Sequence, residues 1–117
     1  MRFSSVAEFI SNHSNFIVTA HETPDGDAIG SECALCQALN QLNKSVIIVN
    51  ADPMAKKYSF LDIENTIKIL DSDFTIPEDI GSWGLFILDT NDIHNIGQVS
   101  ELILPLVKNY FIIDHHE

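Results

Sequence analysis

Three short apolar runs in this chain are each followed by ionisable side chains, and this pattern limits the possible folds more than any other feature. The runs have the length and the β-branched or aromatic character of strands, and they occupy residues 16–20, 85–88 and 111–113. The residues that follow them directly are His21, Asp89 and Asp114. Because parallel strands point the same way, these tips should meet at one edge of a sheet, where open α/β sheets bind ligands. Carboxylates and imidazoles gathered there would repel one another unless cations lay between them, so the pattern predicts a metal site.

The segments between these runs alternate between helical and strand patterns. Helices are predicted from residue 4 or 5 to about 12, from about 28 to 40–43, and near 96–108. The five predicted strands are residues 16–20, 45–50, 66–70, 85–88 and 110–113. Pro105 should kink the third helix or end it at Leu104, because proline lacks the amide proton. This alternation is typical of an α/β fold, here a Rossmann-like parallel sheet of about five strands with helices on both faces.

Length and charge limit the classes of function. With 117 residues the chain forms one domain at most, which is large enough for a hydrophobic core. Six basic and seventeen acidic residues give a net charge of -11, which argues against a surface that grips nucleic-acid phosphates through Lys and Arg. No signal peptide is visible, and the apolar runs are far shorter than the ~20 residues that a membrane span needs. We therefore expect a cytoplasmic protein with no membrane partner.

The loop after the first predicted strand holds a dense group of candidate ligands. His21, Asp25 and Asp27 lie within seven residues, and Gly26 removes a side chain between the two carboxylates. Imidazole with carboxylates suits Mn²⁺, Fe²⁺, Zn²⁺ or Co²⁺, and the oxygen-rich set favours Mn²⁺. Alternatively, Asp25 or Asp27 is the N-cap of the following helix. Together with Asp89, which could instead cap a turn, the loop predicts two metal ions about 3.5–4 Å apart that share a carboxylate.

Several other residues have both a functional and a structural interpretation. Cys33 and Cys36 could form a redox or zinc pair, but small residues buried within a helix are the expected case, because zinc would need a second pair. Lys56, Lys57 and Tyr58 form the one basic and aromatic cluster in the sequence. These three residues could touch substrate, although a solvated helix face is favoured. The remaining histidines are expected to be solvated, namely His13 and His94.

The amino-acid sequence of the acidic clusters resembles the motifs of the DHH phosphoesterases. The sequence HETPDGDAIGS at 21–31, a strand that ends at Asp89, and the final Asp-His-His are similar to the first three motifs of that family. The first motif is most similar to the bacterial group of bifunctional oligoribonucleases and 3′-phosphoadenosine 5′-phosphate phosphatases. The resemblance implies that residues 1–117 are the N-terminal part of a DHH domain. The fourth motif and a C-terminal substrate-binding domain would then lie in cis beyond Glu117.

The resemblance also implies how the ions would be held. His21 and Asp25 would hold the first metal ion. Asp27 and His115 would hold the second, and Asp89 would bridge both. The expected cofactor is a pair of Mn²⁺ ions, with Mg²⁺ or Co²⁺ as alternatives.

Further roles follow from the same resemblance. Asp114 would hydrogen-bond His115 and fix its tautomer. His116 would face the substrate phosphate and stabilise charge as the leaving oxygen departs. Gly30 and Ser31, at the start of the second helix, would let a phosphate approach backbone amides. Asp114, His116 and Asp89 are therefore the expected catalytic residues.

The predicted function is a metal-dependent phosphoesterase that cleaves short single-stranded RNA or DNA, or nucleotide phosphomonoesters, by a two-metal, metal-hydroxide mechanism. The fragment alone is expected to be inactive. One alternative is a non-catalytic metal-binding, nucleotide-binding or regulatory module, because Asn95 stands where the family often has Arg. A manganese-dependent pyrophosphatase-like enzyme or a cyclic-dinucleotide phosphodiesterase is a further alternative. A dinucleotide site near Asp52 is disfavoured, because 25–30 lacks the G-x-G-x-x-G glycines.

Overall fold

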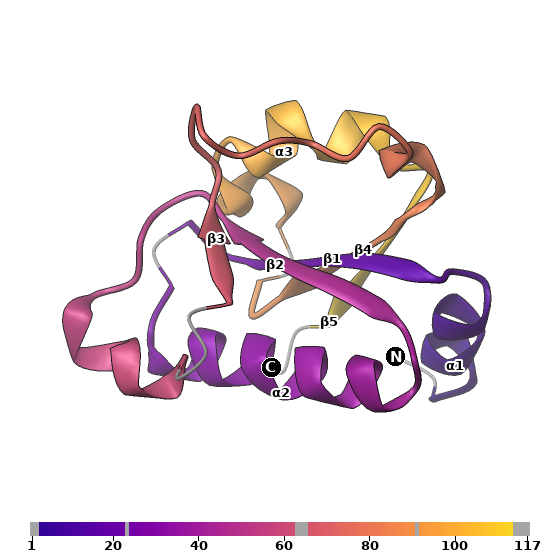
Figure 1. The fold of residues 1–117 in the computed structure, drawn as a ribbon, viewed down its shortest axis with the longest axis horizontal. Coiled ribbons are helices and arrows are strands. Elements are labelled where there is room, and N and C mark those ends of the chain that lie inside the picture. Colours follow the sequence, from indigo (N-terminus) through magenta and orange to yellow (C-terminus); the bar gives the residue numbers. More distant parts are fainter. Residues whose placement is uncertain (1–2, 23, 63–65, 91, 114–117) are drawn as a thin grey trace.

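The computed structural model of this chain describes residues 3–22, 24–62, 66–90 and 92–113 (Figure 1). Its centre is one sheet of five strands, which are β1 (Asn15–Ala20), β2 (Ser45–Asn50), β3 (Ile67–Ile69), β4 (Gly84–Leu88) and β5 (Asn109–Ile113). All neighbouring strands pair in parallel, in the order β3-β2-β1-β4-β5. The predicted α/β fold and its five parallel strands are confirmed.

Helices cover both faces of the sheet (Figure 1). The helices α1 (Phe3–Ser11) and α2 (Gly26–Gln41) pack on one face. The opposite face is covered by short elements, which are η2 (Ile80–Ser82), η3 (Ile93–Ile96), α3 (Val99–Leu102) and η4 (Leu104–Leu106). A further 3-10 helix, η1 (Lys56–Leu61), follows β2 and lies beside the first turns of α2. None of the described helices is long and apolar enough to cross a membrane.

The central strand β1 is apolar on both sides because both of its faces are covered. Phe16 and Val18 point into the core beneath α1 and α2, where they join Phe9 of α1. Ile17 points to the other face and joins the core formed with Val99 of α3. All three β1 side chains are fully buried, as expected of a strand in a doubly covered parallel sheet. The sheet is therefore a rigid base for the loops at its edge.

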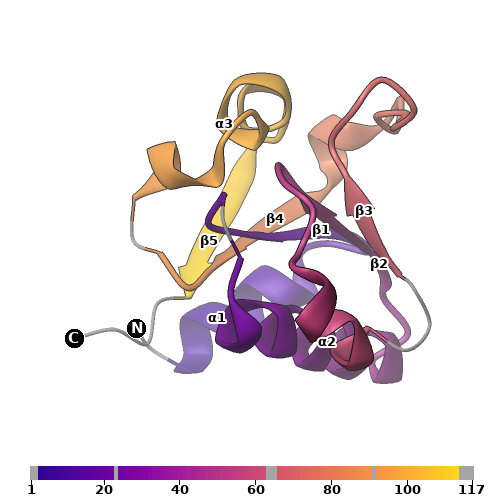
Figure 2. The same cartoon turned by 90° about the vertical axis from the view of Figure 1, so that its left-hand side faces the viewer.

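The strand order reverses its direction between β1 and β4. From β1 the chain winds outward through α2 to β2 and β3, and then it returns to the other side of β1 as β4. Ala20 pairs with Leu88 at the carboxyl ends of these two strands. Open α/β sheets bind ligands at such a reversal, where the loops from adjacent strands diverge. Figure 2 shows this edge of the sheet facing the viewer.

The predicted helix at 96–108 is wrong in its extent. The structure contains only α3, from Val99 to Leu102, followed by the 3-10 turn η4 that contains Pro105. Gly97 has a φ of 63°, a conformation outside the helix, and Pro105 lacks an amide proton for a further turn. The apolar spacing of this segment predicted a longer buried face, but Leu102 and Leu106 are each 47% exposed.

The prediction that His13 is solvated is also wrong. His13 follows α1 and is only 8% exposed. Its Nδ1 lies 2.8 Å from the carbonyl oxygen of Phe9, and its ring packs beside the rings of Phe9 and Phe16. The imidazole therefore closes the apolar core at the end of α1. His94 is exposed, as predicted.

Candidate metal centre

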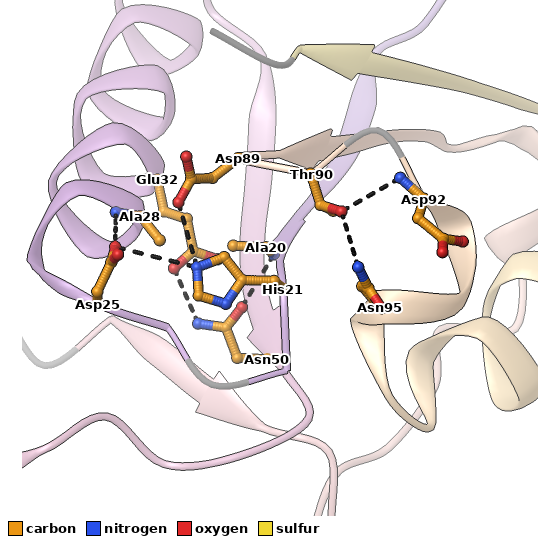
Figure 3. Close-up of polar contacts among 10 residues, drawn as sticks. All are labelled: Ala20, His21, Asp25, Ala28, Glu32, Asn50, Asp89, Thr90, Asp92 and Asn95. Carbon is orange, nitrogen blue, oxygen red and sulfur yellow. Dashed lines mark hydrogen bonds and ion pairs between the residues drawn. The ribbon is translucent and has the colours of Figure 1, made fainter. Parts of the chain in front are cut away.

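Three side chains from the loops after β1 and β4 converge at this reversal of the strand order (Figure 3). The Nε2 atom of His21 lies 3.2 Å from Oδ2 of Asp89 and 3.9 Å from Oδ1 of Asp25. One ligand atom of each residue lies within 4.8 Å of the others. His21 and Asp89 meet because each directly follows one of two adjacent, in-register strands. The structure thus brings together three of the five residues predicted as metal ligands.

The sequence offered helix capping and metal binding as alternative roles for Asp25, and the structure shows the capping. Its Oδ1 accepts a hydrogen bond of 2.9 Å from the backbone amide of Ala28, so Asp25 is the N-cap of α2. The same oxygen faces His21, and the side chain is 57% exposed. A carboxylate has about four lone-pair sites, so one helix amide does not exhaust its capacity. Capping and metal binding are therefore compatible at Asp25.

Asp89 is held much more tightly than Asp25. Its side chain is 2% exposed, and its φ of 63° lies in the left-handed region. That conformation is uncommon outside glycine, although Asp tolerates it better than most residues. The amide of Asp89 donates a 3.0 Å hydrogen bond to the carbonyl of Ile113, which ties the last described residue to the centre. A backbone conformation of this kind persists only where the surrounding structure holds it in place. Such conformations are often found at functional sites.

The loop after Asp89 is folded around Thr90. The Thr90 hydroxyl oxygen accepts hydrogen bonds from the amide of Asp92 at 3.2 Å and from the side-chain amide of Asn95 at 3.4 Å (Figure 3). The carbonyl of Asn95 in turn accepts a 2.6 Å hydrogen bond from the amide of Glu22. Asn95 thus joins the loops after β1 and β4. It stands where the DHH phosphoesterases often have Arg.

Sequence reasoning missed a buried polar pair beneath the centre. The side-chain amide of Asn50 donates a 2.8 Å hydrogen bond to Oε1 of Glu32. Its carbonyl oxygen accepts one of 3.2 Å from the amide of Ala20, the residue before His21 (Figure 3). Glu32 is fully buried. The signal in the sequence was a glutamate among Ile29, Cys33 and Cys36, on the apolar side of a predicted helix.

Burial raises the pKa of Glu32 to about 8 from an ordinary value of 4.5, although the hydrogen bond from Asn50 opposes this rise. Within the described residues Oε2 of Glu32 has no hydrogen-bond partner. An ionised carboxylate in such a place would be poorly stabilised, because burial disfavours the charged form. Glu32 is therefore protonated at neutral pH in the metal-free protein.

Three other predicted site residues, all among the described ones, are not part of the convergent group. Asp27 lies in the first turn of α2 with an exposed side chain, and Gly30 and Ser31 are partly buried one turn further on. Nothing lies within 4 Å of where a Cβ on Gly30 would stand, so there is open space beside it. Asp114, His115 and His116 lie outside the described residues. The roles of all these residues remain predictions.

The cysteine pair lies inside α2, as expected. Cys33 and Cys36 are partly buried beside a cavity of about 300 Å³ between α2 and the segment that leads to β3. Burial raises the pKa of the Cys33 thiol to about 11, and the nearby Asp62 adds to this rise. At neutral pH Cys33 is a thiol rather than a reactive thiolate.

The donor set suits a divalent ion. One imidazole nitrogen and two carboxylates, one of them almost completely shielded from water, provide the mixed nitrogen and oxygen ligands that Mn²⁺, Fe²⁺, Co²⁺ and Zn²⁺ accept. Asp89 is the best placed to share its two oxygens, because its side chain contacts His21 after β1 while its amide is bonded to Ile113 at the end of β5. These three residues thus fit one divalent ion of the predicted kind, and the second ion remains a prediction.

The sheet order and this cluster define an α/β protein with a candidate metal centre at its topological switch point. The model of the DHH family N-terminal domain matches residues 15–117, so the chain belongs to the DHH family. The fold is similar to that of an exopolyphosphatase-related protein from Bacteroides fragilis, with a TM-score of 0.82 and 21% sequence identity. That match covers 97% of this chain and 34% of the other, so the chain spans about a third of that protein. Comparison with curated proteins found no match.

Proposed function

We propose that this chain is the metal-binding part of a DHH-type phosphohydrolase that cleaves phosphoester bonds of short oligonucleotides or nucleotide phosphomonoesters. The observation that carries the proposal is the meeting of His21, Asp25 and Asp89 at the switch point of a parallel sheet. Membership of the DHH family supports it. Within the family, the first motif favours the group of bifunctional oligoribonucleases and 3′-phosphoadenosine 5′-phosphate phosphatases.

In this proposal His21 and Asp25 would hold one ion, and Asp89 would help to hold both that ion and a second. The ions, when bound, acidify a water molecule and neutralise charge on the phosphoryl group. Shielding from water makes the carboxylate of Asp89 a stronger partner for cations than an exposed one. The hydrogen bonds through Asn50 and Asn95 keep the two loops in register, so that the ligands are in place before substrate binds.

Substitution of Asp89 tests the proposal in the complete protein. We expect Asp89→Asn to lower Mn²⁺-dependent hydrolysis of a trinucleotide at least about 100-fold and to weaken Mn²⁺ binding in calorimetry. Asp92→Asn is the matched control, since Asp92 is an exposed acid of the same loop that caps the amide of His94. It should leave both measurements unchanged. Full turnover in the Asp89 variant would contradict the proposal.

The same experiment separates the alternative functions. Mn²⁺ and nucleotide binding without cleavage of the trinucleotide, and without phosphate release from a nucleotide phosphomonoester, would favour the non-catalytic module. Faster hydrolysis of pyrophosphate or of a cyclic dinucleotide than of the trinucleotide would move the substrate class to those alternatives, with the metal centre unchanged.

A further inference from the structure

The 3-10 helix η1 contacts the loop that carries the candidate ligands. A Cβ on Gly26 would stand 3.2 Å from Cε1 and 3.5 Å from Cδ1 of Tyr58, so the Tyr58 ring covers the glycine between Asp25 and Asp27. Figures 1 and 2 both show η1 beside the first turn of α2. The prediction that Lys56, Lys57 and Tyr58 form a solvated helix face therefore does not hold for Tyr58, which anchors η1 beside the metal centre.

Basic side chains are scarce, and two of the six are in η1. In the described part of the chain, Lys44 and Lys108 precede β2 and β5 at the opposite edge of the sheet, and Lys68 lies within β3. Lys56 and Lys57 are thus the described cations that follow the carboxyl end of a strand. The Nζ of Lys57 is 5.2 Å from the centroid of the Tyr58 ring, a cation–π distance. This contact places one ammonium group beside the ring that covers Gly26.

An unusually exposed aromatic ring completes η1. Phe60 is 68% exposed, more than any other large apolar side chain in the described residues. A single exposed Phe would mean little. Here it lies within three residues of Lys57, on an element whose Tyr58 packs against Gly26, the residue after the candidate ligand Asp25. Exposed aromatic rings with nearby cations bind unpaired nucleobases by stacking, while the cations bind the adjoining phosphates.

We propose that η1 is a nucleotide-binding subsite of the metal centre, in which a base of a short single-stranded substrate stacks on Phe60, Lys57 binds the adjoining phosphate, and Tyr58 fixes η1 against Gly26. This inference rests on the proposed function, because it assigns the substrate class of the same centre. It explains how a chain of net charge -11 can accept an anionic substrate, since Lys56 and Lys57 belong to the element whose Tyr58 packs on Gly26, next to Asp25 of the candidate metal centre.

The test compares a trinucleotide with an abasic trinucleotide of equal charge, using the complete protein and Mn²⁺. We expect Phe60→Ala to lower the preference for the trinucleotide about tenfold, through KM rather than kcat. We expect Lys57→Gln to raise KM for both substrates and to reduce the dependence of KM on salt. The matched controls are Leu42→Ala, an exposed apolar residue remote from the strand tips, and Lys108→Gln, a cation of the opposite edge. Leu42→Ala should leave the substrate preference unchanged, and Lys108→Gln should leave KM and its salt dependence unchanged.

Binding of a fluorescent trinucleotide, measured in parallel, separates the two proposals. Loss of affinity in the Phe60 variant of a protein that cleaves neither substrate would support the subsite and contradict the proposed function. Normal cleavage with an unchanged preference in that variant would overturn the subsite alone. An equal loss on both substrates with a lower unfolding midpoint would also overturn it, because Phe60 would then be an internal packing residue of the complete protein.

Discussion

The two loops that form the candidate metal centre are held in place by different means. Below the loop after β1, support comes from side-chain hydrogen bonds. Asn50 joins the amide of Ala20 to the carboxyl group of Glu32, and Asp25 caps α2. These contacts depend on polar atoms that titrate or that a similar side chain can replace.

The loop after β4 is held by backbone conformation and close packing. Asp89 and Gly97 both have a φ of 63°. A Cβ on Gly97 would stand 2.6 Å from Cβ of Ala51 and 3.3 Å from Cβ of Glu22, so three loops meet at that glycine. The stability of the β1 side should therefore depend on pH, and this side should tolerate isosteric substitutions. The β4 side should tolerate almost no added atom.

The largest expected loss of stability comes from Gly97→Ala. The added methyl group would overlap Ala51, and the backbone conformation would be strained for any side chain. We expect the free energy of unfolding to fall by about 3 kcal/mol or more, measured by urea denaturation.

Gly30→Ala is the matched control for Gly97→Ala. Gly30 lies inside α2 with nothing within 4 Å of the added Cβ. This variant should be up to about 1 kcal/mol more stable than the parent, because alanine favours the helix. Equal effects of the two substitutions would contradict the view that the β4 side is held by its backbone.

The next largest effect is a pH dependence that originates at Glu32. Between pH 4.5 and about 8 the folded protein keeps a proton on Glu32 that the unfolded chain releases. Stability is therefore highest below the unfolded pKa and falls as the pH rises through this window, levelling off above the folded pKa. From pH 6 to pH 8 we expect a loss of about 2 kcal/mol from this group, measured by urea denaturation in EDTA.

Glu32→Gln should remove most of that slope. Glutamine has nearly the shape of the protonated acid, and its carbonyl oxygen can accept the hydrogen bond from Asn50. The parent and the variant should thus differ little near pH 5, and the variant should be the more stable near pH 8. The same slope in both proteins would show that Glu32 is not protonated in the folded state.

The smallest expected effect on stability comes from substitutions of Asp25, which distinguish helix capping from metal binding. Asp25→Asn keeps the cap on the amide of Ala28, so the free energy of unfolding in EDTA should change by less than about 0.5 kcal/mol. Asp25→Ala removes the cap and should lose about 1 kcal/mol. Both variants should bind Mn²⁺ more weakly, because neither has the carboxylate. Undiminished Mn²⁺ affinity in the Asn variant would restrict Asp25 to capping.

Much of the fold was predictable because its signals are local. A continuous apolar run such as 46–49 is typical of a buried strand, and Asp25 before a predicted helix is a typical N-cap. The prediction of one helix at 96–108 was wrong because it also relied on a local signal. Its apolar spacing was helical, but the backbone at Gly97 and the missing amide of Pro105 divided it into single turns.

The candidate site was predicted in part. His21 and Asp89 follow strands, so the sequence alone indicated that both would stand at the same edge of the sheet. The contact of 3.2 Å between them required β1 and β4 to be neighbours, which local patterns do not encode. Glu32 could not be assigned, because its role depends on Asn50, which is 18 residues away in the chain.

The order of residues by itself determined the parallel α/β class, the ionisable residues at the strand ends and the cap of α2, since each depends on neighbours in the chain. Only the tertiary structure decided the strand order, the protonation of Glu32, the left-handed backbone at Asp89 and the packing of Tyr58 on Gly26. Each of these depends on contacts between residues that are distant in sequence. Such contacts shield a side chain from water or restrict the space around it, and they form only after the sheet and its covering helices have assembled.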